Sequence, residues 1–302
     1  MAITVGIAGI TGKFARELTS ALLKYPDVTI KGYCRDPSKV PESISSKVSL
    51  TKGDAFDTSA ICSFVAGCDV VVCCYLGDDK VMVDGQKALI DACAAEGVPR
   101  YVASDWALDY TKLKLGDLFP KDPMIHVKAY LDSHDKVKGV HILVGMFMDV
   151  FFGPMFGTFD AATATFKYWG TGDEIWEATT YRNAAEYTAA VCVDKEAVGV
   201  KKFVGGRATI REVAASFEKV YGVKPNLERQ GSVDDLYKRM HELRQKDPRN
   251  VFSYMFLFYQ YYMVNGQTLL GPENDNGKYP QIKPVTWEDY LRSVPKDQLL
   301  SA

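Results

Sequence analysis

An apolar strand pattern at residues 3–7 runs into three glycines spaced three residues apart, Gly6, Gly9 and Gly12, and a helical pattern follows at 13–25. Glycines let the backbone approach a pyrophosphate closely, and the N-terminus of a helix stabilises its negative charge. The alternative is a tight strand-to-helix turn that binds nothing. Because strand, glycine turn and helix occur in this order, the stretch predicts dinucleotide binding.

The charged residues after the second predicted strand, at 28–34, bear on the choice of cofactor. In this type of fold an acidic residue there binds the ribose 2′-hydroxyl, whereas an arginine accommodates a 2′-phosphate. Arg35 and Lys39 favour a phosphate, and Asp36 would repel it. Since arginine pairs strongly with phosphate, the turn predicts NADP(H) rather than NAD(H). The alternative is a solvated turn of mixed charge.

Further predicted cofactor residues lie at the carboxyl ends of the strands, where such sheets bind ligands. The loop after a strand at 48–51 would border the adenine, and the turn after a strand at 69–75 would cover the pyrophosphate and ribose. The predicted set is Gly6, Gly9, Thr11, Gly12, Lys13, Phe14, Arg35, Lys39, Asp54, Ala55, Phe56, Tyr75, Leu76, Gly77, Ser104, Met146 and Phe147.

Strand and helix patterns alternate through about residue 145, which predicts an α/β fold with a Rossmann-type, doubly wound parallel sheet. We expect an NADP(H)-binding Rossmann domain over residues 1–150. Residues 151–302 would form a smaller, mixed α/β substrate-binding region, with some strands and helices returning to the Rossmann core. Further predicted elements are strands at 99–104, 140–145, 162–169 and 201–204, and helices at 58–66 (capped by Thr58), 80–96, 123–139, 182–193, 209–221, 232–246 and 249–264, with a last helix from Thr286.

The composition narrows the class of protein. Among 302 residues, 36 basic and 38 acidic side chains leave a net charge of −2, which gives no electrostatic case for binding nucleic acid or an anionic membrane. Seven cysteines without CxxC spacing indicate reduced thiols, and four histidines without ligand spacing predict no metal site. With no signal-peptide or membrane-spanning pattern, we expect a cytoplasmic protein, monomer or homodimer, whose partner is a small-molecule substrate.

Candidate catalytic groups follow the fifth predicted strand. Typical short-chain dehydrogenases combine a serine there with a Tyr-x-x-x-Lys pair on the next helix. Tyr110 and Lys114 have this spacing, but Tyr110 follows Ser104 by only six residues, so a chance match is favoured. The other candidate is Lys128, although Met124 stands where the tyrosine would be.

With these features the chain resembles the NmrA-like, isoflavone-reductase-type atypical short-chain dehydrogenases. The resemblance rests on residues 11–14, 35–39, 104–106 and 170–173, and on the lone lysine, Lys128, in the following helix. It is closest to fungal NmrA-like proteins, many of them encoded among secondary-metabolite genes. It implies NADPH binding, with Lys128 beside the nicotinamide as general acid/base or as a group that orients the cofactor. NmrA itself is a regulator, so a non-catalytic redox sensor is the alternative.

The substrate site is expected between the strand ends and an aromatic-rich helix at 249–264. A pocket of aromatic and thioether side chains would suit a bulky, flat, apolar substrate. Asp105, the second predicted catalytic residue, would stabilise a cationic nitrogen and so favour an alkaloid-like substrate. We therefore predict an NADPH-dependent reductase of C=N, C=C or C=O bonds, alone or coupled to rearrangement or cyclisation. The predicted substrate residues are Trp106, Asp109, Met148 and Phe152.

Overall fold

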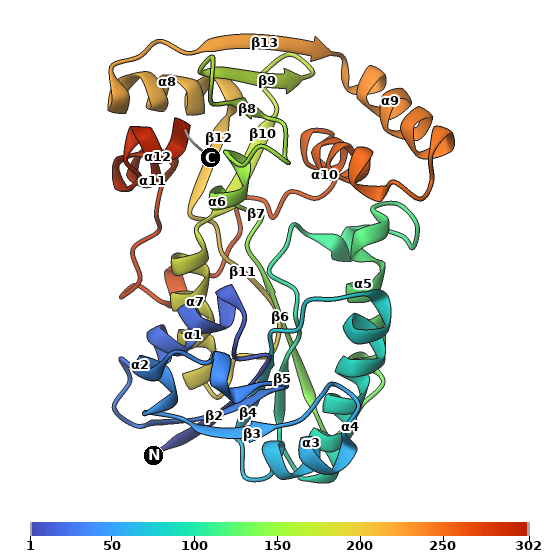
Figure 1. Cartoon of the computed structure of the whole chain (residues 1–302), viewed down its shortest axis with the longest axis vertical. Coiled ribbons are helices and arrows are strands. Elements are labelled where there is room, and N and C mark those ends of the chain that lie inside the picture. The colour runs from blue at the N-terminus through green and yellow to red at the C-terminus, as the bar shows by residue number, and fades with distance from the viewer. Residues whose placement is uncertain (1, 301–302) are drawn as a thin grey trace.

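A parallel sheet of seven strands forms one half of the molecule, the lower half in Figure 1. The computed structural model describes residues 2–300. The strand order is β11-β6-β5-β4-β1-β2-β3, so the order reverses between β1 and β4, where such sheets bind ligands. This confirms the predicted α/β, doubly wound fold. The strands are β1 (Ile3–Ala8), β2 (Val28–Cys34), β3 (Ser49–Lys52), β4 (Val70–Cys73), β5 (Arg100–Val102), β6 (Lys138–Leu143) and β11 (Gly199–Lys202).

Helices cover both faces of this sheet (Figure 1). On one face α1 (Lys13–Leu22) and α7 (Tyr181–Val193) pack with the strands into one apolar core. On the other face lie α3 (Thr58–Val65), α4 (Gln86–Ala95) and α5 (Asp122–Asp132) with a second core. A sheet buried on both faces needs near-continuous apolar strands, and all four residues of β4 are buried. The short α2 (Glu42–Ser45) follows β2.

Within residues 2–300, the upper half contains two small sheets and six α-helices. One sheet has the order β12-β10-β7 and the other β13-β9-β8. An aromatic core that includes Phe151, Phe166 and Trp287 holds them together. Among residues 2–300, no helix is both long and apolar enough for a membrane span. The elements are β7 (Met146–Phe147), α6 (Met148–Phe151), β8 (Phe159–Asp160), β9 (Thr165–Trp169), β10 (Ile175–Thr179), β12 (Gly206–Thr209), α8 (Ile210–Tyr221), β13 (Asn226–Gly231), α9 (Val233–Lys246), α10 (Met255–Val264), α11 (Trp287–Ser293) and α12 (Lys296–Leu300).

Two segments of the second half of the chain belong spatially to the large sheet. Helix α7 packs against α1, and β11 pairs in parallel with β6 as an edge strand. The other half consists of the two small sheets with α6, α8, α9, α10, α11 and α12 (Figure 1). A division of the chain at residue 150 stays a prediction, because the polypeptide crosses between the halves more than once.

Several predicted element ends differ from the structure. The helix expected at 123–139 ends at Asp132, and the one expected at 249–264 begins at Met255 after a 3-10 turn. Asp57 rather than Thr58 caps α3, because its carboxylate accepts a hydrogen bond from the Ala60 amide. The helix from Thr286 is followed by the short α12, so it is not the last one. The capping box predicted at Thr209 is confirmed.

Candidate functional site

The glycine turn lies at the carboxyl edge of the sheet, between β1 and α1. Gly9 has a φ of +81°, and a Cβ there would lie 2.9 Å from the carbonyl oxygen of Cys74. Gly6 lies within β1 rather than in the turn, and a Cβ there would come within 3.0 Å of Cys68 Sγ in the core behind the strand. Gly12 is the N-cap of α1 and has no side chain to occupy the first-turn amides. These amides are therefore available to an anion such as a pyrophosphate.

The turn after β2 presents Arg35 and Lys39 on the surface. Asp36 is turned into the local backbone, because its Oδ1 accepts hydrogen bonds from the Ser38 amide (3.1 Å) and hydroxyl (2.6 Å). These hydrogen bonds lower the pKa of Asp36. The carboxylate therefore has local partners, whereas the predicted phosphate-binding cations are exposed.

The loop after β3 carries the predicted adenine contacts. The Asp54 carboxylate accepts from the Phe56 amide (2.7 Å), and the Tyr33 hydroxyl donates to the Asp54 carbonyl (2.7 Å). Phe56 is 44% exposed, with the ammonium of Lys80 5.1 Å from its ring centroid. Ala55 lies close to Gly85. An exposed aromatic ring held beside the sheet edge is suited to pack on a flat base.

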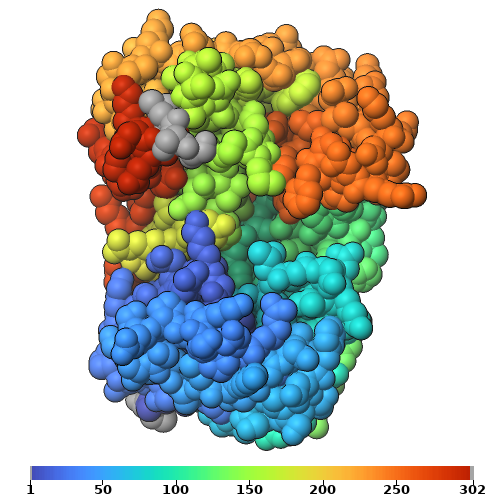
Figure 2. Space-filling model, viewed as in Figure 1, coloured from blue at the N-terminus to red at the C-terminus, as the bar shows by residue number. Residues whose placement is uncertain are grey.

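A cavity of about 370 Å³ lies between the carboxyl edge of the sheet and the upper half; we call it the main cavity. Figure 2 shows the surface hollowed between the cyan lower part and the orange α9–α10 segment. Apolar side chains dominate its wall, with Lys121 and Asp105 as the charged residues among those described. Its lining comprises Phe14, Cys74, Tyr75, Leu76, Met82, Ser104, Asp105, Trp106, Ala107, Leu108, Lys121, Met124, Gly145, Met146, Phe147, Val150, Phe156, Tyr181, Met255, Phe256, Tyr259 and Met263.

An aromatic group forms one side of the main cavity. The rings of Phe14 and Trp106 lie 4.0 Å apart between centroids, and Phe147 stacks on Tyr181 at 3.9 Å. Lys13 places its ammonium 4.4 Å from the Tyr181 centroid. Trp106 has the unusual φ of +29°. Phe14, Trp106, Phe147 and Tyr181 come from four segments that are separate in the sequence. These four segments thus meet at the end of the glycine turn.

Cofactor residues predicted at the ends of β4 and β5 are joined by hydrogen bonds. The Ser104 hydroxyl donates to the Tyr75 carbonyl (2.8 Å), and the Ser104 amide donates to Gln86 Oε1 (3.1 Å). Tyr75, Ser104 and Leu76 all line the main cavity, and Leu76 is 94% exposed. Burial raises the pKa of Tyr75. Gly77 lies outside the lining.

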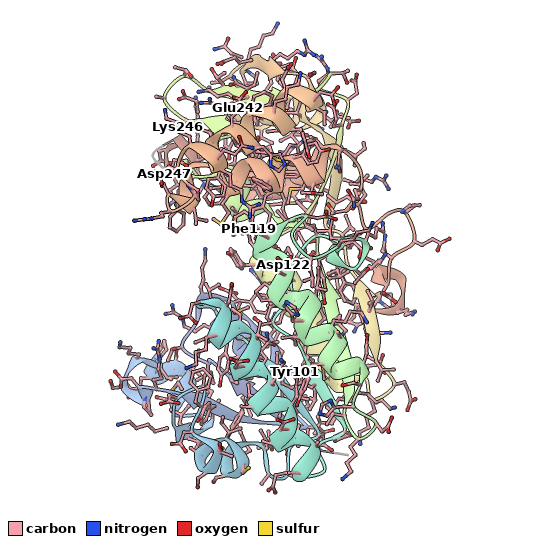
Figure 3. The ribbon with its side chains drawn as sticks, turned by 90° about the vertical axis from the view of Figure 1, so that its right-hand side faces the viewer. Tyr101, Phe119, Asp122, Glu242, Lys246 and Asp247 are labelled. Atoms are coloured by element: carbon pink, nitrogen blue, oxygen red, sulfur yellow. The ribbon has the colours of Figure 1, made fainter. Side chains whose placement is uncertain are left out.

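Lys121 is the cation of the main cavity, although the sequence prediction placed a different lysine there. It ends the 3-10 turn Phe119–Lys121 before α5 and is only 8% exposed. Its ammonium lies 5.2 Å from the ring centroid of Tyr259, and no ion pair with a carboxylate is found within residues 2–300. Figure 3 labels the flanking Phe119 and Asp122, which lie beneath α9 at the upper end of α5.

Lys128 lies outside the main cavity. Its ammonium binds Asp132 of the same helix at 2.7 Å, and it lines a separate recess of about 220 Å³ with Tyr110. Lys128 comes seven residues after Lys121, which is about 10 Å further along a helix. The expectation of Lys128 beside the nicotinamide therefore finds no support in its placement.

The second predicted catalytic residue, Asp105, lines the main cavity but has partners inside the protein. Its Oδ2 accepts from the Tyr110 hydroxyl (3.0 Å) and lies 2.7 Å from Nδ1 of the buried His141. Burial, then the neighbouring Asp105, raises the pKa of Tyr110. Tyr110 lies in a 3-10 turn that ends at Lys112, so Tyr110 and Lys114 do not share a helix.

Of the predicted substrate residues, Trp106 lines the main cavity and the other three do not. Met148 and Phe152 are buried in the aromatic core of the upper half. Asp109 is buried, and its Oδ2 accepts from the Lys202 ammonium at 2.8 Å. Burial alone would raise the pKa of Asp109, but the hydrogen bonds from Lys202 and Thr111 outweigh it and lower the pKa.

The comparisons with known proteins agree with this geometry. Residues 9–140 match the family model described as NAD(P)H-binding. No curated protein sequence matches the chain.

Solved structures extend the likeness to nearly the whole chain. Isoflavone reductase is 17% identical, with a TM-score of 0.78 over 97% of this chain and 99% of its own. AtPrR2 with NADP+ and (+)pinoresinol is 18% identical, with a TM-score of 0.77 and the same coverage. The NADPH-dependent quinone oxidoreductase from Escherichia coli, complexed with NADPH, is 18% identical, with a TM-score of 0.77 over 96% of this chain and 99% of that one. The chain thus contains an NAD(P)H-binding domain and has the fold of isoflavone reductase and AtPrR2.

Proposed function

We propose that the protein is an NADPH-dependent oxidoreductase that reduces a bulky, mostly apolar aromatic metabolite. The observation that carries this proposal is Lys121, a buried cation without a carboxylate partner among the described residues, in an apolar cavity beside the glycine turn. Bound NADPH would supply the hydride. The wall of aromatic and methionine side chains would exclude water from the reacting bond.

The sign of the charge in the main cavity favours particular acceptors. Hydride addition to a carbonyl or to a conjugated C=C bond places negative charge on an oxygen. An ammonium group in an apolar site stabilises such an oxygen and can donate a proton to it. An iminium carbon would instead meet the positive charge of Lys121, while the carboxylate of Asp105 is held by His141 and Tyr110. We therefore propose an aromatic ketone, enone or quinone rather than an alkaloid-like imine.

The similar structures and the turn after β2 support the choice of cofactor and substrate class. Two of the similar structures are AtPrR2 with NADP+ and (+)pinoresinol and a quinone oxidoreductase complexed with NADPH. Exposed Arg35 and Lys39 are suited to a 2′-phosphate. A role in secondary metabolism rests on the sequence resemblance, and a cytoplasmic location rests on the cysteine pattern and on the lack of a signal-peptide pattern; both stay predictions.

The test is NADPH oxidation, followed by absorbance, with a panel of aryl enones, quinones and cyclic imines. We expect turnover of enones or quinones, and Lys121→Met should lower kcat/KM at least about 100-fold while NADPH affinity is retained. Lys128→Met is the matched control, since Lys128 pairs with Asp132 away from the cavity. Loss of activity in Lys128→Met but not in Lys121→Met would overturn the assignment.

The alternative of a non-catalytic NADP(H) sensor makes a different prediction. A sensor has no need of an open apolar space for a substrate, whereas this chain has an apolar cavity of about 370 Å³ beside the glycine turn. Tight NADPH binding without turnover of any compound in the panel would favour the sensor.

A further inference from the structure

We propose that the substrate site continues into a second cavity behind Phe156 and Phe256, and that it takes a two-part ligand: an aromatic head in the main cavity and an uncharged, hydrogen-bonding tail in the second. The inference rests on the proposed substrate role of the main cavity. The second cavity measures about 200 Å³. Phe156 and Phe256 line both cavities, so these two rings separate them.

The size of the main cavity is the first argument. Pockets for small molecules and cofactors commonly measure about 300–1,000 Å³. The main cavity, at about 370 Å³, is near the lower end of this range, and its lining includes Phe14 and Tyr75 from the predicted cofactor side. A nicotinamide and a multi-ring substrate would compete for this volume. The neighbouring cavity adds about half as much again.

The two separating rings differ in how firmly they are held. Phe156 is 4% exposed, and its carbonyl accepts a hydrogen bond of 2.6 Å from the buried Gln260 side chain. Phe256 is the second residue of α10 and is only half-buried. The rings meet edge to face, 6.1 Å apart between centroids. Rotation of the Phe256 side chain is therefore the motion that would connect the cavities, without movement of the backbone.

The lining of the second cavity determines which tail it can take. Met155 and Phe252 also line it, and they are 62% and 68% exposed, so an alkyl chain can pack along them. Gln230 and Gln260 supply amide groups whose Nε2 atoms donate to Glu228 and to the Phe156 carbonyl, so their side-chain oxygens are the atoms that can accept from a tail hydroxyl. The charge of Lys167, the cation in this lining, is matched by Asp160 at 3.6 Å. A neutral end group such as a hydroxyl fits this balance better than a carboxylate or an amine.

The experiment measures binding rather than turnover. The probes are chalcone, an aryl enone, and chalcones that carry ω-hydroxyalkoxy chains of increasing length on one ring. Binding to the NADP+-loaded protein is followed by calorimetry. We expect the longer hydroxyalkoxy chalcones to bind the wild type more tightly than chalcone itself. In Phe256→Trp the larger ring should reduce this gain about tenfold or more, and in Phe256→Ala the gain should increase.

Two controls make the result specific. Tyr237→Ala removes a half-exposed aromatic ring from α9 outside both linings, and it should leave the ratio of the affinities unchanged. Chalcones with ω-carboxyalkoxy chains should gain less than their hydroxyl counterparts. The second subsite would be overturned if every added hydroxyalkoxy chain lowered the affinity. It would also be overturned if the ratio of hydroxyalkoxy-chalcone affinity to chalcone affinity were the same in all Phe256 variants. Chalcone binding with no NADPH oxidation by any compound of the panel would overturn the proposed function alone. Failure of every chalcone to bind, with turnover of other compounds in the panel, would overturn the second subsite alone.

Discussion

The two charged side chains of the main cavity have opposite surroundings. Asp105 is held by the hydroxyl of Tyr110 and by His141, so its negative charge already has partners. Lys121 faces the ring of Tyr259. A cation–π contact stabilises an ammonium but leaves its protons available to a ligand oxygen. The positive charge of Lys121, which has no carboxylate partner within residues 2–300, therefore makes the electrostatic field in the main cavity suited to a substrate oxygen that becomes negative during reduction.

Replacing Gly9 by alanine tests the glycine turn. The new Cβ would lie 2.9 Å from the Cys74 carbonyl oxygen at a φ of +81°. We expect the free energy of unfolding to fall by about 3 kcal/mol or more, and NADPH affinity to fall as well. Urea unfolding and calorimetry measure the two effects.

Gly67→Ala is the matched control, because Gly67 has a φ of +73° with no atom within 4 Å of the added Cβ. It should cost only about 1–2 kcal/mol, the penalty of the left-handed conformation. Equal losses at Gly9 and Gly67 would show that the close approach to Cys74 has no energetic weight.

Asp109 gives a prediction for the pH dependence of stability. Its folded-state pKa is lowered, so the ionised carboxylate stabilises the fold above the ordinary pKa of about 3.9. This contribution should be lost as the pH falls through the folded-state pKa. We expect Asp109→Asn to lower the free energy of unfolding by about 1–3 kcal/mol at neutral pH, because the Lys202 pair is broken.

The difference between wild type and Asp109→Asn should shrink below about pH 4 in urea unfolding. Asp132→Asn is the control, since Asp132 is 59% exposed in its pair with Lys128 and surface pairs contribute little. A difference that stays constant from neutral to acidic pH would contradict the assigned role of the Asp109 charge.

Residues local to one turn were predictable from sequence, and residues brought in by distant elements were not. Gly9 and Phe14 lie where strand and helix patterns required them. Tyr181 and Tyr259 reach the same cavity from α7 and α10, and no spacing in the sequence connects them. Lys121 was missed because it precedes the helix; the neighbouring Pro123, typical of a first helical turn, was the signal that could have indicated it.

Helix α7 shows how a segment from the second half of the chain is attached to the large sheet. Its N-terminus is capped by Thr180, whose hydroxyl accepts from the Asn183 amide. At its other end the buried Arg100 of β5 donates to the carbonyl oxygens of Val191 (3.1 Å), Cys192 (2.7 Å) and Asp194 (2.7 Å). The sequence predicted the helix from its period, but it could not indicate that a distant arginine satisfies its last carbonyls.

Arg100→Met should therefore uncouple α7 from the sheet. The variant leaves three buried or half-buried carbonyl oxygens without this donor, which should cost about 3 kcal/mol or more. Arg100→Lys keeps the charge but not the planar fork and should recover only part of the loss. The measurement is urea unfolding. Full stability of the methionine variant would mean that water replaces the guanidinium.

The main cavity lies where the two halves of the molecule meet, so its wall comes from both. Phe14 and Ser104 belong to the sheet half, whereas Phe156 and Phe256 belong to the upper half. Near the join, Phe119, which is labelled in Figure 3, packs against Phe258 of α10 at 5.4 Å between ring centroids, and Arg244 of α9 lies over the Phe119 ring at 5.1 Å. A ligand in the cavity would contact both halves and stabilise the whole molecule against unfolding.

NADPH should accordingly raise the melting temperature as its concentration increases. At a free concentration 100 times Kd the gain is about 2.7 kcal/mol, and for a chain of this size each kcal/mol shifts the melting temperature by about 2–4 °C. Arg35→Ala should reduce the shift given by NADPH and leave the smaller shift given by NADH unchanged, because Arg35 is assigned to the 2′-phosphate alone.

Lys47→Ala, a change of an exposed cation beyond that turn, is the control for a general loss of positive charge. If NADPH and NADH stabilise the wild type equally at equal concentration, the exposed arginine has no role in cofactor choice. In that case Asp36, released from Ser38, becomes the group that binds the ribose.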